Sequence, residues 1–227
     1  MLRFLVFFLC VLTLFRASSQ ELPVVRDTIR ELDEVIINAF VYNRPLKEIP
    51  ASVATVGQQD FQRFNISTLV PAMNTVPGVR LEERSPGSYR VSIRGSTLRS
   101  PFGVRNVKVY WNNIPLTDPG GNTYLNQLDP AMLGSLEVLK GPGSSLYGAG
   151  TGGVLLLSSP YPERGHTLKT AFQVGSFGSE QLSVSYEEGR EQSSHQVEVM
   201  DPQADGYRNQ TRFSREVVIS VFRFETG

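Results

Sequence analysis

The densest run of glycine in the chain contains a spacing that could hold a nucleotide. Gly148-Ala149-Gly150-Thr151-Gly152-Gly153 matches the pattern G-x-G-x-x-G, in which glycines let a pyrophosphate approach the first turn of a helix. That chemistry needs a strand directly before the glycines and a helix directly after them. Here seven residues separate the match from the apolar segment 135–140, and Pro160 closes the apolar run that follows. We therefore interpret this segment as strand, glycine-rich loop, strand, in which glycine serves close packing and positive φ.

The other reactive side chains show no catalytic or metal-binding arrangement in the sequence. His166 and His195 are the only histidines and lack metal-ligand spacing. No motif places a serine, a histidine and an aspartate together. Cys10 is the single cysteine and lies in the first apolar run, so we expect no cysteine in the mature chain. We predict no catalytic residues, no cofactor, no bound metal and no enzymatic activity.

The first 19 residues have the layout of a secretory signal peptide. Arg3 precedes the apolar run 4–14, and Ala17-Ser18-Ser19 forms a small-residue cleavage site before Gln20. The run is too short to span a bilayer as a helix. Without Arg3 and Arg16, acidic residues exceed basic residues by two, which gives no reason to expect a nucleic-acid partner.

Strands and short helices alternate over residues 46–162, which predicts a small α+β domain. Pro71 is compatible with a helix over 67–75 only because it lies in the first turn, with Ser67 as the expected N-cap. Pro77-Gly78 ends that helix. The remaining elements expected are strands at 51–56, 89–95, 107–111 and 136–139, a helix at 60–64 and a helical turn at 130–133.

The pattern changes to strict alternation of apolar and polar residues after Arg164. Leu168, Thr170, Phe172 and Val174 alternate with polar or small neighbours, and the same period returns near 182–187 and 196–200. Residues 216–224 are a fourth candidate strand, but Val217-Val218-Ile219 is apolar at consecutive positions, so the pattern does not assign its faces. Strands with one polar face are typical of a sandwich or a soluble barrel. A transmembrane barrel with a polar lumen produces the same pattern.

Residues 20–45 are polar and unpatterned apart from one apolar patch. Val35-Ile36-Ile37 has high strand propensity in this neighbourhood. An isolated strand of this kind is either an edge that pairs within its own fold or a docking strand for a partner.

The order of these features resembles a TonB-dependent outer-membrane receptor. Residues 33–39 look like the TonB box. The plug-domain motifs of that family are matched by Val76-Pro77-Gly78-Val79, Ser92-Ile93-Arg94-Gly95, residues 109–116 and the long segment 136–148, which reads LEVLKGPGSSLYG. The resemblance covers nearly the whole chain after the signal peptide.

The resemblance implies an α+β plug domain followed by the first antiparallel strands of a transmembrane β-barrel of about 22 strands. The corresponding division is 1–19 signal peptide, 20–45 periplasmic segment with the TonB box, 46–162 plug and 163–227 first barrel strands. The function implied is active import of a scarce nutrient, such as a ferric siderophore or cobalamin, across the outer membrane. The partners implied are TonB, the outer membrane and a small metal chelate, without catalysis.

The resemblance also assigns roles to particular residues. The expected TonB contact is made by Asp33, Glu34, Val35, Ile36, Ile37, Asn38 and Ala39. Arg94 and Lys140 occupy plug positions that usually hold arginines paired with barrel glutamates. The lysine cannot form the planar two-bond fork of an arginine. Candidates for substrate contact on the apical loops are Arg99, Phe102, Arg105 and Tyr124.

A few transmembrane strands cannot close a barrel, because an unpaired edge in lipid leaves backbone groups without partners. We therefore expect the sequence to be the front of a longer receptor. The alternative is an isolated soluble periplasmic module from a truncated gene, with no transport activity.

Overall fold

The computed structural model describes residues 36–37, 44–64, 68–96, 103–148 and 150–224. The expected signal peptide and the TonB-box residues Asp33, Glu34, Val35, Asn38 and Ala39 lie outside this part of the chain. Among the described residues, no helix has both the length and the apolar character needed to cross a membrane. The same residues contain no cluster of three or more side chains suited to holding a metal ion.

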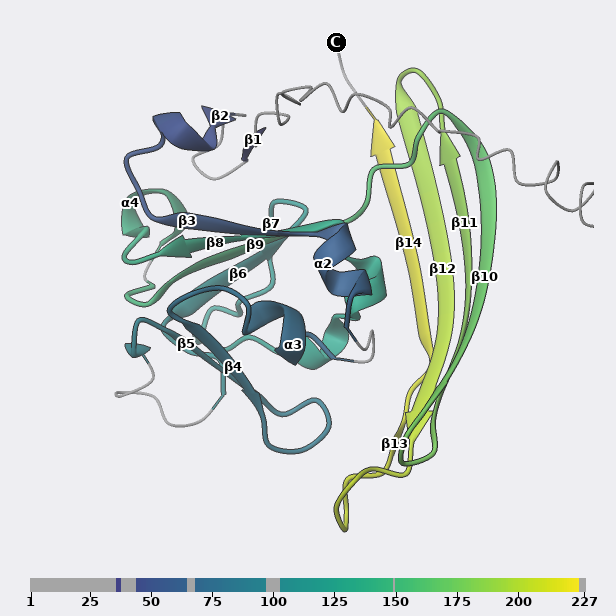
Figure 1. Ribbon diagram of the computed structural model, residues 1–227. Helices are drawn as coiled ribbons and strands as arrows, with labels where there is room; N and C mark the ends of the chain where they lie inside the picture. The colour runs from purple at the N-terminus through teal and green to yellow at the C-terminus, as the bar shows by residue number, and fades with distance from the viewer. Residues whose placement is uncertain (1–35, 38–43, 65–67, 97–102, 149, 225–227) are drawn as a thin grey trace, which may run out of the picture. The chain divides into compact units, whose positions relative to one another are not determined.

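A five-stranded mixed sheet forms the centre of the first folded part (Figure 1). Its order is β3 (Val53–Gly57), β8 (Ser135–Lys140), β9 (Gly153–Ser158), β6 (Val107–Trp111) and β7 (Ile114–Pro115). β6 and β9 run parallel, whereas the other neighbours are antiparallel. The strand predicted at 107–111 is confirmed. It turns into β7 through Asn112 and Asn113, which have φ values of 48° and 67° and are of the residue type that accepts this conformation.

Short helices connect these strands. They are η1 (Leu46–Glu48), α2 (Gln58–Gln62), α3 (Val70–Met73), η3 (Leu125–Gln127), η4 (Pro130–Met132) and α4 (Ser144–Tyr147). The prediction of a helix over 67–75 was wrong in its extent. The helix begins at Val70, with Thr68 Oγ1 accepting the Val70 amide at 3.3 Å, and Pro71 lies in its first turn as expected. The helix predicted at 60–64 begins two residues earlier.

A separate hairpin pairs β4 (Val79–Glu83) with β5 (Tyr89–Ile93). The sequence analysis did not predict β4. Its place is set from outside the strand, because the Asn74 side chain both accepts from the Leu81 amide and donates to the Leu81 carbonyl. The apolar residues of both strands point into the core.

The glycine-rich segment packs between strands and opens no long helix. α4 makes a single helical turn, and Gly153 begins β9 directly. Gly153 has a φ of 147°, and a Cβ there would collide with the Leu139 carbonyl oxygen. Only glycine meets both demands, so the prediction of strand, glycine-rich loop, strand is confirmed apart from the turn of α4.

The second folded part is a sheet of long antiparallel strands. They are β10 (Gly165–Gly175), β11 (Ser179–Gly189), β12 (Ser193–Ala204), β13 (Phe213–Ser214) and β14 (Val217–Phe224). β12 pairs with β11 on one side and with β13 and β14 on the other. The large apolar side chains exposed on the strands of this sheet share its outward face: Leu168, Phe172, Val174, Leu182, Val184, Tyr186, Val199, Val218, Phe222 and Phe224.

The inward face of the same sheet is polar where it meets the first part. Its buried side chains include Gln181, Ser185, Ser194, Gln196 and Glu198. Those polar residues belong to β11 and β12; Met200 of β12 and the inward residues Val217, Ile219 and Val221 of β14 are apolar and pack on the main core. This sheet therefore reverses the ordinary arrangement of a soluble protein.

Candidate functional site

The candidate TonB-binding strand is self-paired. β1 (Ile36–Ile37) runs antiparallel to β2 (Arg44–Pro45) in a two-stranded sheet. Ile37 is 0% exposed and belongs to a small apolar cluster with Ile49, Leu139, Val154 and Leu156. A partner that adds a strand here has to replace β2 or extend the β1–β2 pair. Pairing within the fold and docking of a partner, the two alternatives left open by the sequence, are therefore compatible for this strand.

Arg94 and Lys140 lie beside each other. Arg94 follows β5 with a φ of 50°, and its Nη1 donates to the Lys140 carbonyl oxygen at 3.4 Å. The Arg94 side chain also passes near Gly141. The two positions that the resemblance singled out, 46 residues apart in sequence, thus meet at the end of β8.

Two arginines from the second sheet reach into the first folded part, and the sequence analysis predicted neither. Arg215 forms an ion pair with Asp129, with 2.7 Å between Nη2 and Oδ2. Arg223 donates to the carbonyl oxygens of Pro160 and Ser159 at 3.0 and 3.2 Å. The partners are 63 to 86 residues apart, so no local pattern could have indicated them.

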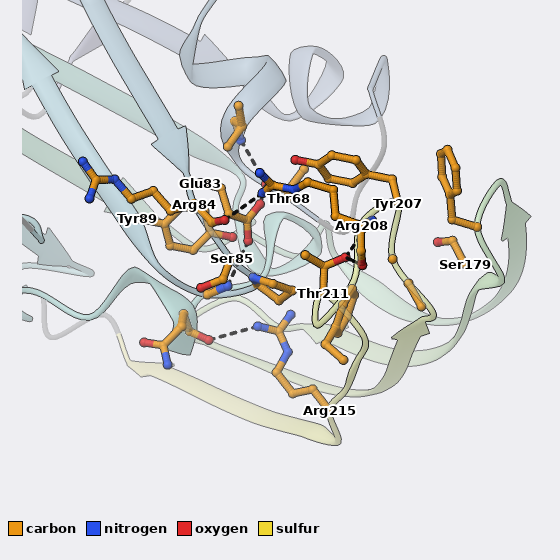
Figure 2. A pocket seen from close by; sticks show the side chains of 18 of the residues that line it. Thr68, Glu83, Arg84, Ser85, Tyr89, Ser179, Tyr207, Arg208, Thr211 and Arg215 are labelled. Carbon is orange, nitrogen blue, oxygen red and sulfur yellow. Dashed lines mark hydrogen bonds between the residues drawn. The ribbon is translucent and has the colours of Figure 1, made fainter.

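A cavity of about 580 Å³ lies where the β4–β5 hairpin meets the end of the second sheet (Figure 2). This volume lies within the range of small-molecule sites. One wall is the hairpin loop, with Arg84 and Tyr89; the other is the β12–β13 connection, with Tyr207 and Arg208. The turn between β10 and β11 adds Phe177, whose ring meets that of Tyr207 edge-on at 6.2 Å.

Hydrogen bonds fix both walls of this cavity. Arg208 Nη2 donates to the Arg84 carbonyl oxygen at 2.8 Å and so joins the two loops. Thr211 Oγ1 accepts from the Arg208 amide and donates to the Arg208 carbonyl oxygen. Glu83 is occupied on both oxygens, by the Gly87 amide and by Thr68 Oγ1.

The charge balance of the lining is positive. Three arginines, at 84, 208 and 215, face one carboxylate, Glu83. The guanidinium of Arg208 also lies over the Tyr207 ring at 4.7 Å, a cation–π arrangement. Arginines beside aromatic rings suit an anionic occupant with flat or aromatic groups.

Burial shifts the titration of two acids in this region. Desolvation raises the pKa of Tyr89 to about 12, and the negative charge of Glu83 adds to the rise. Desolvation also raises the pKa of Asp129, whereas the hydrogen bond from the Ala131 amide and the charge of Arg215 act in the opposite direction. Neutral Tyr89 can therefore donate a hydrogen bond at any physiological pH.

The substrate-contact candidates chosen from the sequence lie elsewhere or outside the described residues. Arg99 and Phe102 fall in the segment 97–102, which the structure does not describe. Arg105 Nε donates to Asn122 Oδ1 at 2.8 Å and lines a separate cavity of about 210 Å³, and Tyr124 is exposed. Backbone hydrogen bonds, first that from Asn122, lower the pKa of the neighbouring Asp118. The roles of all four candidates stay predictions.

Comparison with known families gives one match over this fold. Residues 45–154 match the TonB-dependent Receptor Plug Domain. The chain is 25% identical over 119 residues to the vitamin B12 transporter BtuB of Vibrio vulnificus, covering 52% of this chain and 19% of the relative. It is 32% identical over 133 residues to the ferrioxamine receptor of Yersinia enterocolitica, covering 57% of this chain and 18% of the relative. The chain thus spans about a fifth of the length of the curated relatives it matches.

Solved structures extend the likeness into the second sheet. FpvA of P. aeruginosa, solved with bound pyoverdine and iron, superposes with a TM-score of 0.70 at 18% identity, over 85% of this chain and 25% of that one. The siderophore receptor PiuA of Acinetobacter baumannii gives a TM-score of 0.60 at 21% identity, over 80% of this chain and 25% of that one. These likenesses confirm the predicted fold class of a plug followed by the first antiparallel barrel strands. Residues 45–154 therefore carry a TonB-dependent receptor plug domain, and the chain is similar to receptors of that family.

Proposed function

We propose that this chain is the plug and first wall of an outer-membrane importer that TonB energises. The observation that carries the proposal is the reversed second sheet, which places apolar side chains such as Phe172 and Val218 outward and polar ones such as Gln181 inward. That arrangement suits lipid on one side and a plug-filled lumen on the other. The family of the first folded part supports the same reading.

We propose further that the cavity between the β4–β5 hairpin and the β12–β13 connection faces the outside and receives the substrate. It lies at the end of the sheet opposite Arg223 and the plug-to-sheet connection. The class of substrate that its arginines and aromatic rings favour is an anionic metal chelate. Relatives named as a ferrioxamine receptor and a siderophore receptor support this class, and a vitamin B12 transporter keeps a cobalamin-like substrate as a second candidate.

The energy input would come through β1. TonB would pair with Ile36 and Ile37 as an added strand, in which backbone hydrogen bonds supply the affinity. The apolar cluster around Ile37 would hold the strand against the plug until then. Arg94 and Lys140 would face carboxylates of the barrel wall.

The experiment that tests this function is a proline substitution in β1. Ile36→Pro removes a backbone donor and fixes φ, so uptake of labelled ferrioxamine or cobalamin is expected to fall to background while surface binding of the same probe persists. Ile36→Ala is the matched control, because it keeps the backbone donor and should keep most uptake. Unchanged uptake in the proline variant would refute the role of β1.

The competing function is a soluble periplasmic interaction module that uses the plug alone. The outward apolar face of the second sheet argues against this function, because it would be exposed to water and would promote aggregation. Recovery of the native product as a soluble periplasmic protein would favour the module over the importer.

A further inference from the structure

Arg215 is placed to hold two parts of the molecule together. It lies between β13 and β14, and its own amide donates to the Pro202 carbonyl oxygen at 3.1 Å, which anchors its backbone to β12. Its Nη1 donates to the Asn126 carbonyl oxygen at 2.9 Å, and its Nη2 donates to Asp129 Oδ2 at 2.7 Å. The guanidinium thus uses two of its nitrogens on one short stretch of the plug, a geometry that a lysine cannot reproduce.

Asp129 is the buried end of this contact. Its side chain is 0% exposed, and its Oδ1 accepts from the Ala131 amide at 3.0 Å as the cap of η4. Within the described part of the chain, Arg215 is the cation paired with this carboxylate. Loss of the cation would leave a buried charge held only by backbone hydrogen bonds at the start of η4, an arrangement that proteins tolerate poorly.

The segment that Asp129 begins leads into β8, and β8 contacts the apolar cluster that holds β1. After η4, the Gly134 amide donates to the Ser158 carbonyl oxygen and β8 starts at Ser135. Leu139, near the end of β8, packs in the same apolar cluster as Ile37. β3 and β9 hold β8 along both edges, and the contact from the wall to Asp129 adds a constraint at the start of the segment whose far end packs in the cluster of Ile37.

We propose that Arg215 is a positioning residue that keeps β1 folded against the plug, acting through Asp129, η4 and β8. The same arginine lines the cavity, so it joins the cavity end of the wall to the strand at the other end of the plug. The identification of TonB as the partner of the released strand rests on the proposed function. The release of β1 itself is measured without TonB and without substrate.

The test uses a new cysteine in a mature chain that is expected to contain none. Ile37→Cys is introduced with and without Arg215→Ala, and the rate of labelling by a membrane-impermeant maleimide is measured in isolated membranes opened to expose the periplasmic side. The proposal predicts that Arg215→Ala raises the labelling rate at position 37 about tenfold, which corresponds to about 1.4 kcal/mol. Val91→Cys, at a fully buried core position, should stay protected in both backgrounds.

Two further variants separate the ion pair from general damage. Asp129→Asn combined with Arg215→Ala removes the buried charge as well as its partner, so labelling at position 37 should return toward the starting rate. Arg208→Ala removes another arginine of the same cavity that contacts no buried carboxylate and should leave labelling unchanged.

Equal labelling with and without Arg215 would overturn the proposal, as would equal exposure of the cysteines at 37 and 91, because that result shows loss of the whole plug fold. If Arg215→Ala does not accumulate, Arg215→Lys takes its place: a raised labelling rate at position 37 supports the proposal, and an unchanged rate overturns it.

Discussion

The plug and the second sheet use the same two-residue period in opposite senses. In β6 of the plug, Val107 and Val109 point inward and are almost wholly buried. In β10 and β14, Phe172 and Val218 point outward and are 67% and 72% exposed. The plug buries most of its apolar side chains within itself, whereas β11 and β12 turn mainly polar side chains toward the plug.

This difference shows that alternation by itself gives a strand and its two faces but not which face meets the interior. The medium around each element decides that. Under the proposed function the outward face of the sheet meets an apolar medium, while the plug carries its own core. Identical substitutions in the two regions should therefore have different consequences.

The largest expected effect on stability comes from a lysine at one apolar position in each region, buried in the plug core or outward on the second sheet. Val109→Lys buries an unpaired charge in the plug core and should abolish its folding, at a cost above about 4 kcal/mol. Phe172→Lys should leave the plug folded and reduce membrane insertion, at a cost of about 2–4 kcal/mol near the bilayer centre and less toward the interfaces.

Near-ultraviolet circular dichroism in detergent reports the plug fold, and resistance to alkaline extraction reports insertion. Val109→Thr is the matched control for volume without charge. A Phe172→Lys variant that loses the plug signal, or that inserts as well as the parent, would break the comparison.

A smaller effect is expected from one methyl group added to a glycine of each region. Gly153→Ala meets the Leu139 carbonyl oxygen and the Ile93 side chain and should cost on the order of 3 kcal/mol. Gly165→Ala, at the start of β10, has a positive φ but open space, so about 1 kcal/mol of backbone strain is expected. Urea unfolding in detergent measures both changes, and equal values would show that packing at Gly153 is looser than its contacts indicate.

The smallest effect is a titration confined to one side chain. Tyr89, at the plug side of the cavity, has a pKa raised to about 12 because burial disfavours the phenolate. A raised pKa means that the folded state holds the proton more tightly than the unfolded chain does. The free energy of unfolding is therefore unaffected by this group below pH about 10 and falls as the pH rises through about 12. The difference in tyrosinate absorbance between the parent and Tyr89→Phe should therefore have its midpoint near pH 12. A midpoint near 10 would show that Tyr89 is solvated.

Much of the fold could be predicted from local signals. The strand 107–111 has alternating apolar residues and an Asn-Asn turn at its end, and both features act within a few residues. The residues that flank the glycine pattern at 148–153 were sufficient to distinguish it from a nucleotide-binding site. The family resemblance then supplied the order of the domains.

What could not be predicted depends on distant partners. β4 has only Val79 and Leu81 as buried apolar residues, and the bonds from Asn74 that position it come from a different element. Helix α3 starts at Val70, three residues after the expected cap. The ion pair of Arg215 with Asp129 joins residues that are 86 positions apart in sequence, and no pattern in the neighbouring residues indicates the contact.

The central claim is that the outward face of the second sheet meets lipid and the inward face meets the plug. Val184 and Ser185 are neighbours in β11 on opposite faces, exposed and buried respectively. A fluorophore attached to a cysteine at each position can be tested in outer membranes that contain nitroxide-labelled lipid. The account predicts strong quenching at position 184 and weak quenching at position 185. Equal quenching at the two positions, or stronger quenching at 184 by a water-soluble agent than by the lipid, would contradict it.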